Sequence, residues 1–271
     1  MNNHARMGVN QERLRGALAA IGRALVLATA AAATAAYAAP HEITVFDDEI
    51  EHPGGVGLDL HVNHARGRRT PDFASEIPPH RVTRLMPEVI VGLAKDWELG
   101  LHFPMQLDAG GKYHDDGLRA RVKHVPARAD GEAMYAGFNV ELGYDRAHLS
   151  EDRHNFELRG ILGWEQGPWK AVFNPIFAWV LKGANKGAAP EFEASVKVAR
   201  EVSGGWSAGL EHYAGLGRWN RFLPRREQDH MLYFALDYAG KDFGLNLGVG
   251  GGLTPASDHF VVKAVVSLPI R

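Results

Sequence analysis

The clearest pattern in the chain is an alternation of apolar and polar residues between Glu88 and Leu107. In the second half of this stretch one face carries only apolar side chains, namely Trp97, Leu99, Leu101, Phe103, Met105 and Leu107. Glu98, His102 and Gln106 fall on the other face, and a period of two residues is typical of a β-strand. Lys95-Asp96 separates the two halves and predicts a tight turn. The stretch is therefore expected to form a β-hairpin with one apolar and one polar face.

The same alternation recurs in segment after segment from Gly57 to the end of the chain. It predicts about twelve strands of roughly 8–13 residues each and no helix after residue 40. Short connections such as Lys95-Asp96 and Gly240-Lys241 alternate with longer polar loops, at 65–82, 108–116, 146–153, 183–190 and 217–229. An even number of strands, with short turns on one side and long loops on the other, is typical of a barrel that spans a membrane.

Aromatic residues collect at the strand ends and share the parity of the apolar face. Those beside the short connections are Trp97, Trp164, Trp169, Trp206, Tyr238 and Phe243. Those toward the opposite strand ends are Tyr144, Phe156, Trp179, Phe192 and Phe260. Indole and phenol rings at the level of lipid headgroups form two such girdles, whereas the core of a soluble sandwich would hold its large aromatic residues in mid-strand. The aromatic pattern therefore favours lipid outside the strands.

These patterns predict an all-β fold, an antiparallel transmembrane β-barrel of about 12 strands with short periplasmic turns and longer extracellular loops. No uncharged apolar run after residue 40 approaches the ~18 residues of a membrane-spanning helix. The alternative is a soluble periplasmic or secreted β-sandwich with a binding or structural role, because a solvated outer face can also alternate in this way.

The N-terminus predicts export from the cytoplasm. Arg6, Arg13, Arg15 and Arg23 precede an alanine-rich apolar core, and Ala36-Tyr37-Ala38 fits the small-x-small rule for signal peptidase. We expect residues 1–38 to be a cleaved signal peptide, 39–53 an acidic periplasmic N-terminal segment, and 54–271 the outer-membrane barrel. An N-terminal membrane anchor is the alternative reading of this stretch.

Composition narrows the function further. The 271 residues include no cysteine, which excludes disulfides, thiol nucleophiles and cysteine-ligated metals, and the net charge of −2 gives no overall attraction to nucleic acid. A Ser-His-acid site is not expected, because Ser207 and His212 point to opposite faces of one strand. The 14 histidines are scattered, with His61 and His102 on the polar face. We therefore predict no enzyme activity, no metal site and no cofactor.

The polar face of the predicted strands would line the lumen of a barrel. Predicted lumen-lining residues are Glu98, His102, Arg119, Arg121, Lys123, Asn139, Glu141, Glu157, Arg159 and Asn246. Arg119, Arg121 and Lys123 form a basic ladder, which needs acidic partners on the flanking strands. Opposite this ladder the chain offers a wall almost without side chains, made of Gly244, Asn246, Gly248 and Gly250. That wall is expected to give a route for polar or anionic solutes, or room for residues 39–53 to fold in as a plug; the alternative is a core closed by ion pairs.

The hairpin also carries a resemblance. Gly92 to Leu101 follows a pattern that recurs in Gram-negative outer-membrane barrels, Gly-Leu-x-x-Asp-x-Glu-Leu-Gly-Leu, before a Gly/Asp-rich loop and a lysine-containing strand. Over Glu88–Lys123 the chain resembles the transporter family named for the MetA pathway of phenol degradation. The resemblance implies an outer-membrane channel for small molecules. One departure is the C-terminus, Leu268-Pro269-Ile270-Arg271, which lacks the terminal aromatic residue that the insertion machinery reads in many barrels.

The predicted function is thus an outer-membrane channel or transporter for small polar or aromatic solutes. Its expected partners are outer-membrane lipid and lipopolysaccharide, the barrel-insertion machinery and a small-molecule solute, and not nucleic acid. Arginines of two long loops are expected at the cell surface, where they could pair with lipid phosphates or remain solvated. They are Arg66, Arg68, Arg69, Arg218, Arg221, Arg225 and Arg226.

Overall fold

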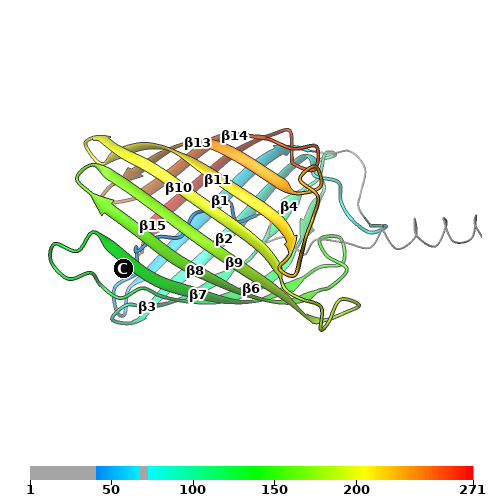
Figure 1. Cartoon of the computed structure of the whole chain (residues 1–271), viewed down its shortest axis with the longest axis horizontal. Coiled ribbons are helices and arrows are strands. Elements are labelled where there is room, and N and C mark those ends of the chain that lie inside the picture. The colour runs from blue at the N-terminus through cyan, green and yellow to red at the C-terminus, as the bar shows by residue number, and fades with distance from the viewer. Residues whose placement is uncertain (1–40, 68–72, 271) are drawn as a thin grey trace, which may run out of the picture. The chain divides into compact units, whose positions relative to one another are not determined.

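The structure is a computed structural model that describes residues 41–67 and 73–270. These residues form one closed antiparallel β-barrel (Figure 1). Its strands are β1 (Val56–Arg66), β2 (His80–Ala94), β3 (Trp97–His102), β4 (Met105–Leu107), β5 (Tyr113–Asp115), β6 (Gly117–His124), β7 (Met134–Asp145), β8 (His154–Gln166), β9 (Trp169–Lys182), β10 (Glu191–Ser203), β11 (Trp206–Arg218), β12 (Arg221–Phe222), β13 (Asp229–Ala239), β14 (Gly244–Gly252) and β15 (Phe260–Pro269).

The barrel closes because β1 pairs with both β2 and β15. Twelve strands cross it, as the sequence predicts. Two of them are interrupted side by side: β3 and β4 are separated at Phe103-Pro104, and β5 and β6 at Asp116. Proline cannot donate a hydrogen bond to the ladder; the carbonyl of Pro104 instead accepts one from the backbone of Asp116, at 3.0 Å. The predicted strand from Trp97 to Leu107 is therefore present but kinked.

The barrel has a turn end and a loop end. Tight connections at Lys95-Asp96, Gly167-Pro168 and Gly204-Gly205 mark the turn end, where β1 also begins and β15 ends. The long connections mark the loop end, and two are shorter than predicted. Strand β2 already begins at His80, and β5 forms inside the expected loop 108–116, because it pairs with β4.

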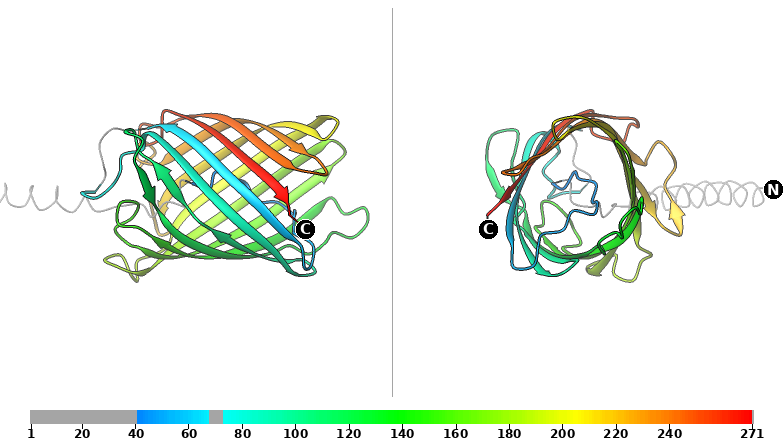
Figure 2. Two further views of the ribbon diagram at one scale, coloured as in Figure 1. Left: turned by 180° about the vertical axis from the view of Figure 1, so that it is seen from behind. Right: turned by 90° about the vertical axis from the view of Figure 1, so that its left-hand side faces the viewer.

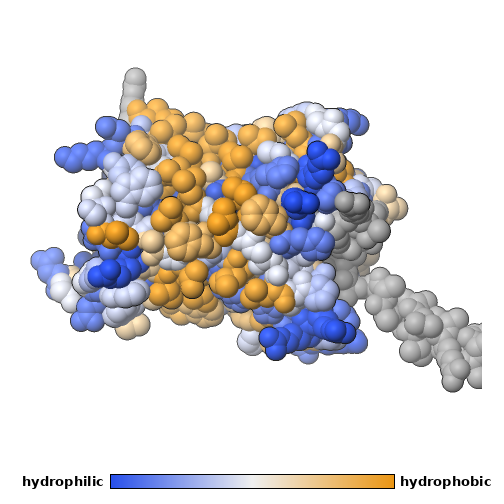
Figure 3. Space-filling view, turned by 90° about the horizontal axis from the view of Figure 1, so that it is seen from above, coloured by the Kyte–Doolittle hydropathy of each residue, from blue (hydrophilic) through white to orange (hydrophobic). Residues whose placement is uncertain are grey.

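Apolar side chains cover the outside of the wall. Figure 3 shows them as a broad band between hydrophilic ends. The band contains large side chains that are more than a third exposed, such as Leu162 (48%), Leu210 (52%) and Phe234 (52%). Polar and charged side chains of the opposite strand face point inward, and among them Arg159, Glu211 and Lys263 are each at most 2% exposed. A soluble protein has the reverse distribution, so the alternative of a soluble sandwich is wrong.

Several members of the two aromatic sets form ring contacts within their own set. At the turn end the rings of Trp206 and Tyr238 are 4.9 Å apart, and those of Tyr238 and Phe243 are 5.1 Å apart. At the loop end Phe156 lies 5.6 Å from Trp179. The other predicted girdle residues at the turn end are Trp97, Trp164 and Trp169, of which Trp97 (36%) and Trp169 (46%) are exposed.

Some predictions lie outside the described residues. They concern the signal peptide at 1–38, Arg68, Arg69 and the final Arg271. Among the residues that are described, no helix is long and apolar enough to cross a membrane.

Candidate luminal site

A segment without regular secondary structure, residues 41–55, runs inside the barrel. Figure 2 shows it in blue within the ring of strands when the barrel is seen end-on. It begins near Asp116 at the loop end and reaches the turn end, where the backbone of Gly54 donates to the carbonyl of Gly92 at 2.8 Å. The described part of residues 39–53 thus lies within the barrel, as in the plug alternative, and the division of the chain at residues 38 and 53 stays a prediction. We call residues 41–55 the luminal segment.

The loop end of the luminal segment is held by its first described residue. His41 and His148 contact the two carboxylate oxygens of Asp116, each through Nε2 at 2.5 Å. Asn63 donates to the carbonyl of His41 at 3.3 Å. Burial lowers the pKa of His41 to about 4, so the ring is neutral near pH 7 and donates to the carboxylate.

Phe46 fixes the middle of the luminal segment. The side-chain amide of Asn174 accepts from the backbone N–H of Phe46 at 2.8 Å and donates to its carbonyl at 2.9 Å, as a neighbouring strand would. The ring of Phe46 faces three cations, with Arg159 at 4.4 Å, Arg121 at 5.1 Å and Lys123 at 5.3 Å from its centroid. A cation over an aromatic face is attracted to the ring quadrupole.

The rest of the luminal segment is acidic and meets basic side chains of the wall. Lys170 contacts Asp47 at 2.8 Å, and Arg128 contacts Asp48 at 2.8 Å. Lys123 donates to the backbone carbonyl of Glu49 at 2.5 Å. The segment is thus bound by charge as well as by hydrogen bonds, which explains why an irregular stretch has a defined path.

The basic ladder makes cross-strand ion pairs. Arg119 contacts Glu141 at 2.9 Å and Asp145 at 2.6 Å, as expected from the flanking strand β7. Arg121 contacts Glu98 at 2.7 Å on the adjacent β3, and it also reaches Glu88 at 2.5 Å, one strand farther away. Sequence reasoning missed Glu88.

Glycine explains that longer reach. Gly100 pairs with Arg121 across the ladder, and a Cβ on Gly100 would lie 2.7 Å from the Nε atom of Arg121. Without a side chain there, the guanidinium crosses β3 to β2. The signal in the sequence is an inward glycine on one strand, with a long basic side chain on the strand to one side of it and a carboxylate on the strand to the other side.

The remaining predicted lumen residues also point inward. Glu157 and Arg159 contact each other at 3.0 Å, and Arg159 pairs with Glu42 of the luminal segment at 3.2 Å. Asn139 is 1% exposed, and its amide has no hydrogen-bond partner among the described residues. Asn246 donates to Asp237 at 2.7 Å. His102 lies between Glu88 and Glu141, at 3.0 and 3.3 Å.

The predicted bare wall of glycines is wrong at two of its positions. A Cβ on Gly248 would lie 2.7 Å from Lys263, and one on Gly250 would lie 2.4 Å from the ring of Tyr233. Lys263 crosses Gly248 to form an ion pair with Glu211 on β11. These glycines are therefore covered by neighbouring side chains, and they do not leave an open route.

Among the described residues, two cavities lie along the lumen. The larger, of about 870 Å³, opens at the turn end, and the smaller, of about 120 Å³, lies toward the loop end. Thr44 of the luminal segment lines both, so the segment separates them. Tyr213 also lines the smaller cavity, together with Thr44. Residues Ile43–Phe46 thus lie between the two cavities.

The larger cavity, which we call the turn-end cavity, is acidic. Four lysine or arginine residues line it, namely Arg121, Lys123, Lys170 and Lys197. Nine carboxylates line it, namely Asp47, Glu49, Glu51, Asp59, Glu88, Glu98, Glu165, Glu201 and Asp237. The chain as a whole has a net charge of only −2, so the sequence total does not reveal this local excess.

Comparison with known proteins adds to this picture. No protein-family model matches the chain, and no curated protein sequence matches it. Among solved structures, it is similar to a COG4313 outer membrane channel from Pseudomonas putida F1, with a TM-score of 0.60 and 13% identity over 84% of this chain and 100% of that one. It is also similar to the NanC porin (TM-score 0.53, 9% identity, 78% of this chain and 98% of that one) and to the KdgM porin (TM-score 0.53, 9% identity, 79% and 99%).

At these identities the similarity establishes the fold, which is that of outer-membrane β-barrels. It does not confirm the phenol-degradation family that the hairpin at Gly92–Leu101 resembles.

Proposed function

We propose that the protein is a channel of the Gram-negative outer membrane that passes small polar solutes and favours cations over anions. The observation that carries the proposal is the turn-end cavity, about 870 Å³ of open volume lined by more carboxylates than bases. Excess negative charge in a confined space concentrates cations and repels anions. This revises the expectation of a path for anions. Similarity to solved outer-membrane channels and porins supports the same role.

In this proposal the turn end faces the periplasm and the luminal segment limits the aperture. Solutes pass around Ile43–Phe46, and the passage widens when the segment loosens. The proposal includes no catalytic step.

The smaller cavity suggests a second class of solute. Its volume of about 120 Å³ is close to that of cavities that hold a single aromatic ring, about 150 Å³. Tyr213, Met231 and Tyr233 give it apolar walls, beside the guanidinium of Arg159. We propose that a small aromatic solute enters this cavity from the loop end.

Single-channel recording in planar bilayers tests the proposal. The mature chain should give discrete conductance steps, and a KCl gradient should give a reversal potential of the sign expected for potassium preference. Asn174→Ala removes both hydrogen bonds to Phe46. Each bond contributes ~0.5–1.5 kcal/mol, so the substitution should shift the equilibrium between the docked and the loosened segment about 5- to 150-fold toward the loosened state. The mean conductance should rise accordingly.

Asn139→Ala is the matched control, since Asn139 is an equally buried luminal asparagine whose amide has no described partner. Its conductance should equal that of the wild type. Absence of conductance steps in the wild type would overturn the channel proposal, and a reversal potential of the opposite sign would overturn the cation preference.

A further inference from the structure

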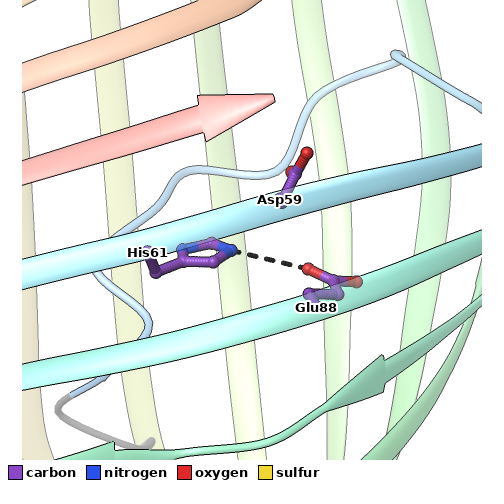
Figure 4. Close-up of side chains that lie close together, drawn as sticks. All are labelled: Asp59, His61 and Glu88. Atoms are coloured by element: carbon purple, nitrogen blue, oxygen red, sulfur yellow. Dashed lines mark ion pairs between the residues drawn. The ribbon is translucent and has the colours of Figure 1, made fainter. Parts of the chain in front are cut away.

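Three potential metal ligands, Asp59, His61 and Glu88, lie together on the inner wall of the barrel (Figure 4). Asp59 and His61 are two residues apart on β1, so their side chains share one face. Glu88 lies on β2, directly opposite Asp59 in the ladder. Each of the three offers one ligand atom, and these atoms all lie within 4.8 Å of one another.

His61 is the residue that points to a ligand. It is only 3% exposed, and neither of its ring nitrogens has a hydrogen-bond partner among the described residues. Its Nε2 faces Oε2 of Glu88 at 3.5 Å, which is beyond the usual hydrogen-bond range. A buried imidazole normally satisfies its nitrogens, and a metal ion between these atoms would do so.

Glu88 is held so that one oxygen remains directed at His61. Its Oε1 atom receives Arg121 at 2.5 Å and His102 at 3.0 Å. Among the described residues, its Oε2 atom has one ion-pair contact, with the imidazole of His61. Outer contacts of this kind orient the carboxylates that ligate metals. Arg121 also pairs with Glu98, so its charge is shared between two carboxylates.

The donor set selects the ion. One imidazole and two carboxylates suit Zn²⁺, which binds nitrogen and oxygen at about 2.0–2.2 Å and accepts water as a fourth ligand. Ligands of a tetrahedral zinc ion are about 3.4 Å apart, so the three side chains need to close only slightly around it. All three line the turn-end cavity, which gives an ion a way in.

We propose that Asp59, His61 and Glu88 form a binding site for a divalent transition-metal ion, with Zn²⁺ preferred, in the wall of the turn-end cavity. The site does not depend on the conduction of solutes. It would explain why β1 and β2 place a histidine with no hydrogen-bond partner beside two carboxylates.

Calorimetric titration of the detergent-solubilised mature chain with ZnCl₂ tests the site, with a purification tag that contains no histidine. We expect one saturable site per chain. His61→Gln and Asp59→Asn should each weaken zinc binding at least tenfold, the usual effect of losing a ligand. Co²⁺ in place of Zn²⁺ should give the visible absorption of a four-coordinate ion in the wild type and not in these variants.

Two histidine variants serve as controls. His52→Gln changes an exposed histidine that lines the same cavity beside Glu51. His230→Gln breaks a close histidine pair elsewhere in the barrel, in which Nδ1 of His230 lies 3.2 Å from Nε2 of His212. Both should bind zinc as the wild type does.

The proposal is overturned if the wild type has no saturable zinc site, or if a folded His61→Gln variant binds zinc as tightly as the wild type. Each variant is first checked for the heat-dependent gel mobility of a folded barrel. If His61→Gln does not fold, Asp59→Asn decides the question, because Asp59 is only partly buried and its loss leaves the ion pairs of Glu88 in place.

Discussion

At the scale of single residues, a few inward side chains determine where the luminal segment lies. Asn174 gives the backbone of Phe46 both hydrogen bonds of a strand partner. Asn139, the same residue type with similar burial, gives none. Strand parity predicts that such side chains point inward, but it does not say which of them meets the segment. That depends on the path of an irregular stretch, which has no period that a sequence pattern could reveal.

A pH-dependent prediction follows from His41. Its pKa is lowered from 6.5 to about 4 by burial, among Asp116, Arg84 and Arg119. The neutral ring is therefore the form that docks, and docking loses stability as pH falls below 6.5, with the full loss reached below about pH 4. A pKa difference of this size corresponds to a loss of about 3 kcal/mol in the free energy of docking. The loop end of the luminal segment should loosen over this range of pH.

Spin labelling can follow that loosening, because the chain contains no cysteine. A nitroxide attached at Thr44→Cys should become more mobile between pH 6.5 and 4 in electron paramagnetic resonance spectra. In a His41→Asn background the mobility should be the same at both pH values, since asparagine does not titrate. Equal pH dependence in both backgrounds would assign the change to another group.

At the scale of strands, the alternation of the sequence predicts which faces point outward and inward, and the structure has the same twelve crossings. What the pattern does not give is the reach of long side chains. Arg121 crosses Gly100 to Glu88, and Lys263 crosses Gly248 to Glu211. Both partners lie beyond the adjacent strand, so a rule based on neighbouring strands misses them. Gly100 provides this room for Arg121, and Gly248, from the predicted bare wall, provides it for Lys263.

Substitutions on the outer face give a prediction for the strands. Leu210 on β11 is 52% exposed in the apolar band. Leu210→Arg should destabilise the folded barrel in lipid vesicles by ~2–4 kcal/mol, because burying an arginine near the middle of a bilayer is unfavourable. Leu253, 60% exposed in the connection after β14, is the matched control, and Leu253→Arg should change the free energy little. Equal effects at both positions would mean that the outer face of β11 does not contact lipid.

At the scale of the whole molecule, the acidic luminal segment and the basic side chains of the wall complement each other. Glu42, Asp47 and Asp48 pair with Arg159, Lys170 and Arg128, which come from three different regions of the barrel. The sequence marks residues 39–53 as acidic and the strand Arg119–Lys123 as basic. It allows residues 39–53 to enter the lumen as a plug, but it cannot say which acidic residue meets which base, because charge complementarity does not specify distance along a chain. For the same reason Asp59, His61 and Glu88 could be grouped only after the register of β1 and β2 was known.

The orientation of the barrel gives the last prediction. In the proposed topology the loop end lies at the cell surface, as is usual for outer-membrane barrels, whose long loops are extracellular. An epitope tag inserted after Arg225, in the exposed connection before β13, should bind antibody on intact cells. A tag after Asp130, in the exposed turn-end connection before β7, should bind antibody only after the cells are permeabilised. The two tags control for each other, because both lie in exposed connections of the same barrel. The reverse pattern of labelling would invert the topology and would place the acidic turn-end cavity at the cell surface.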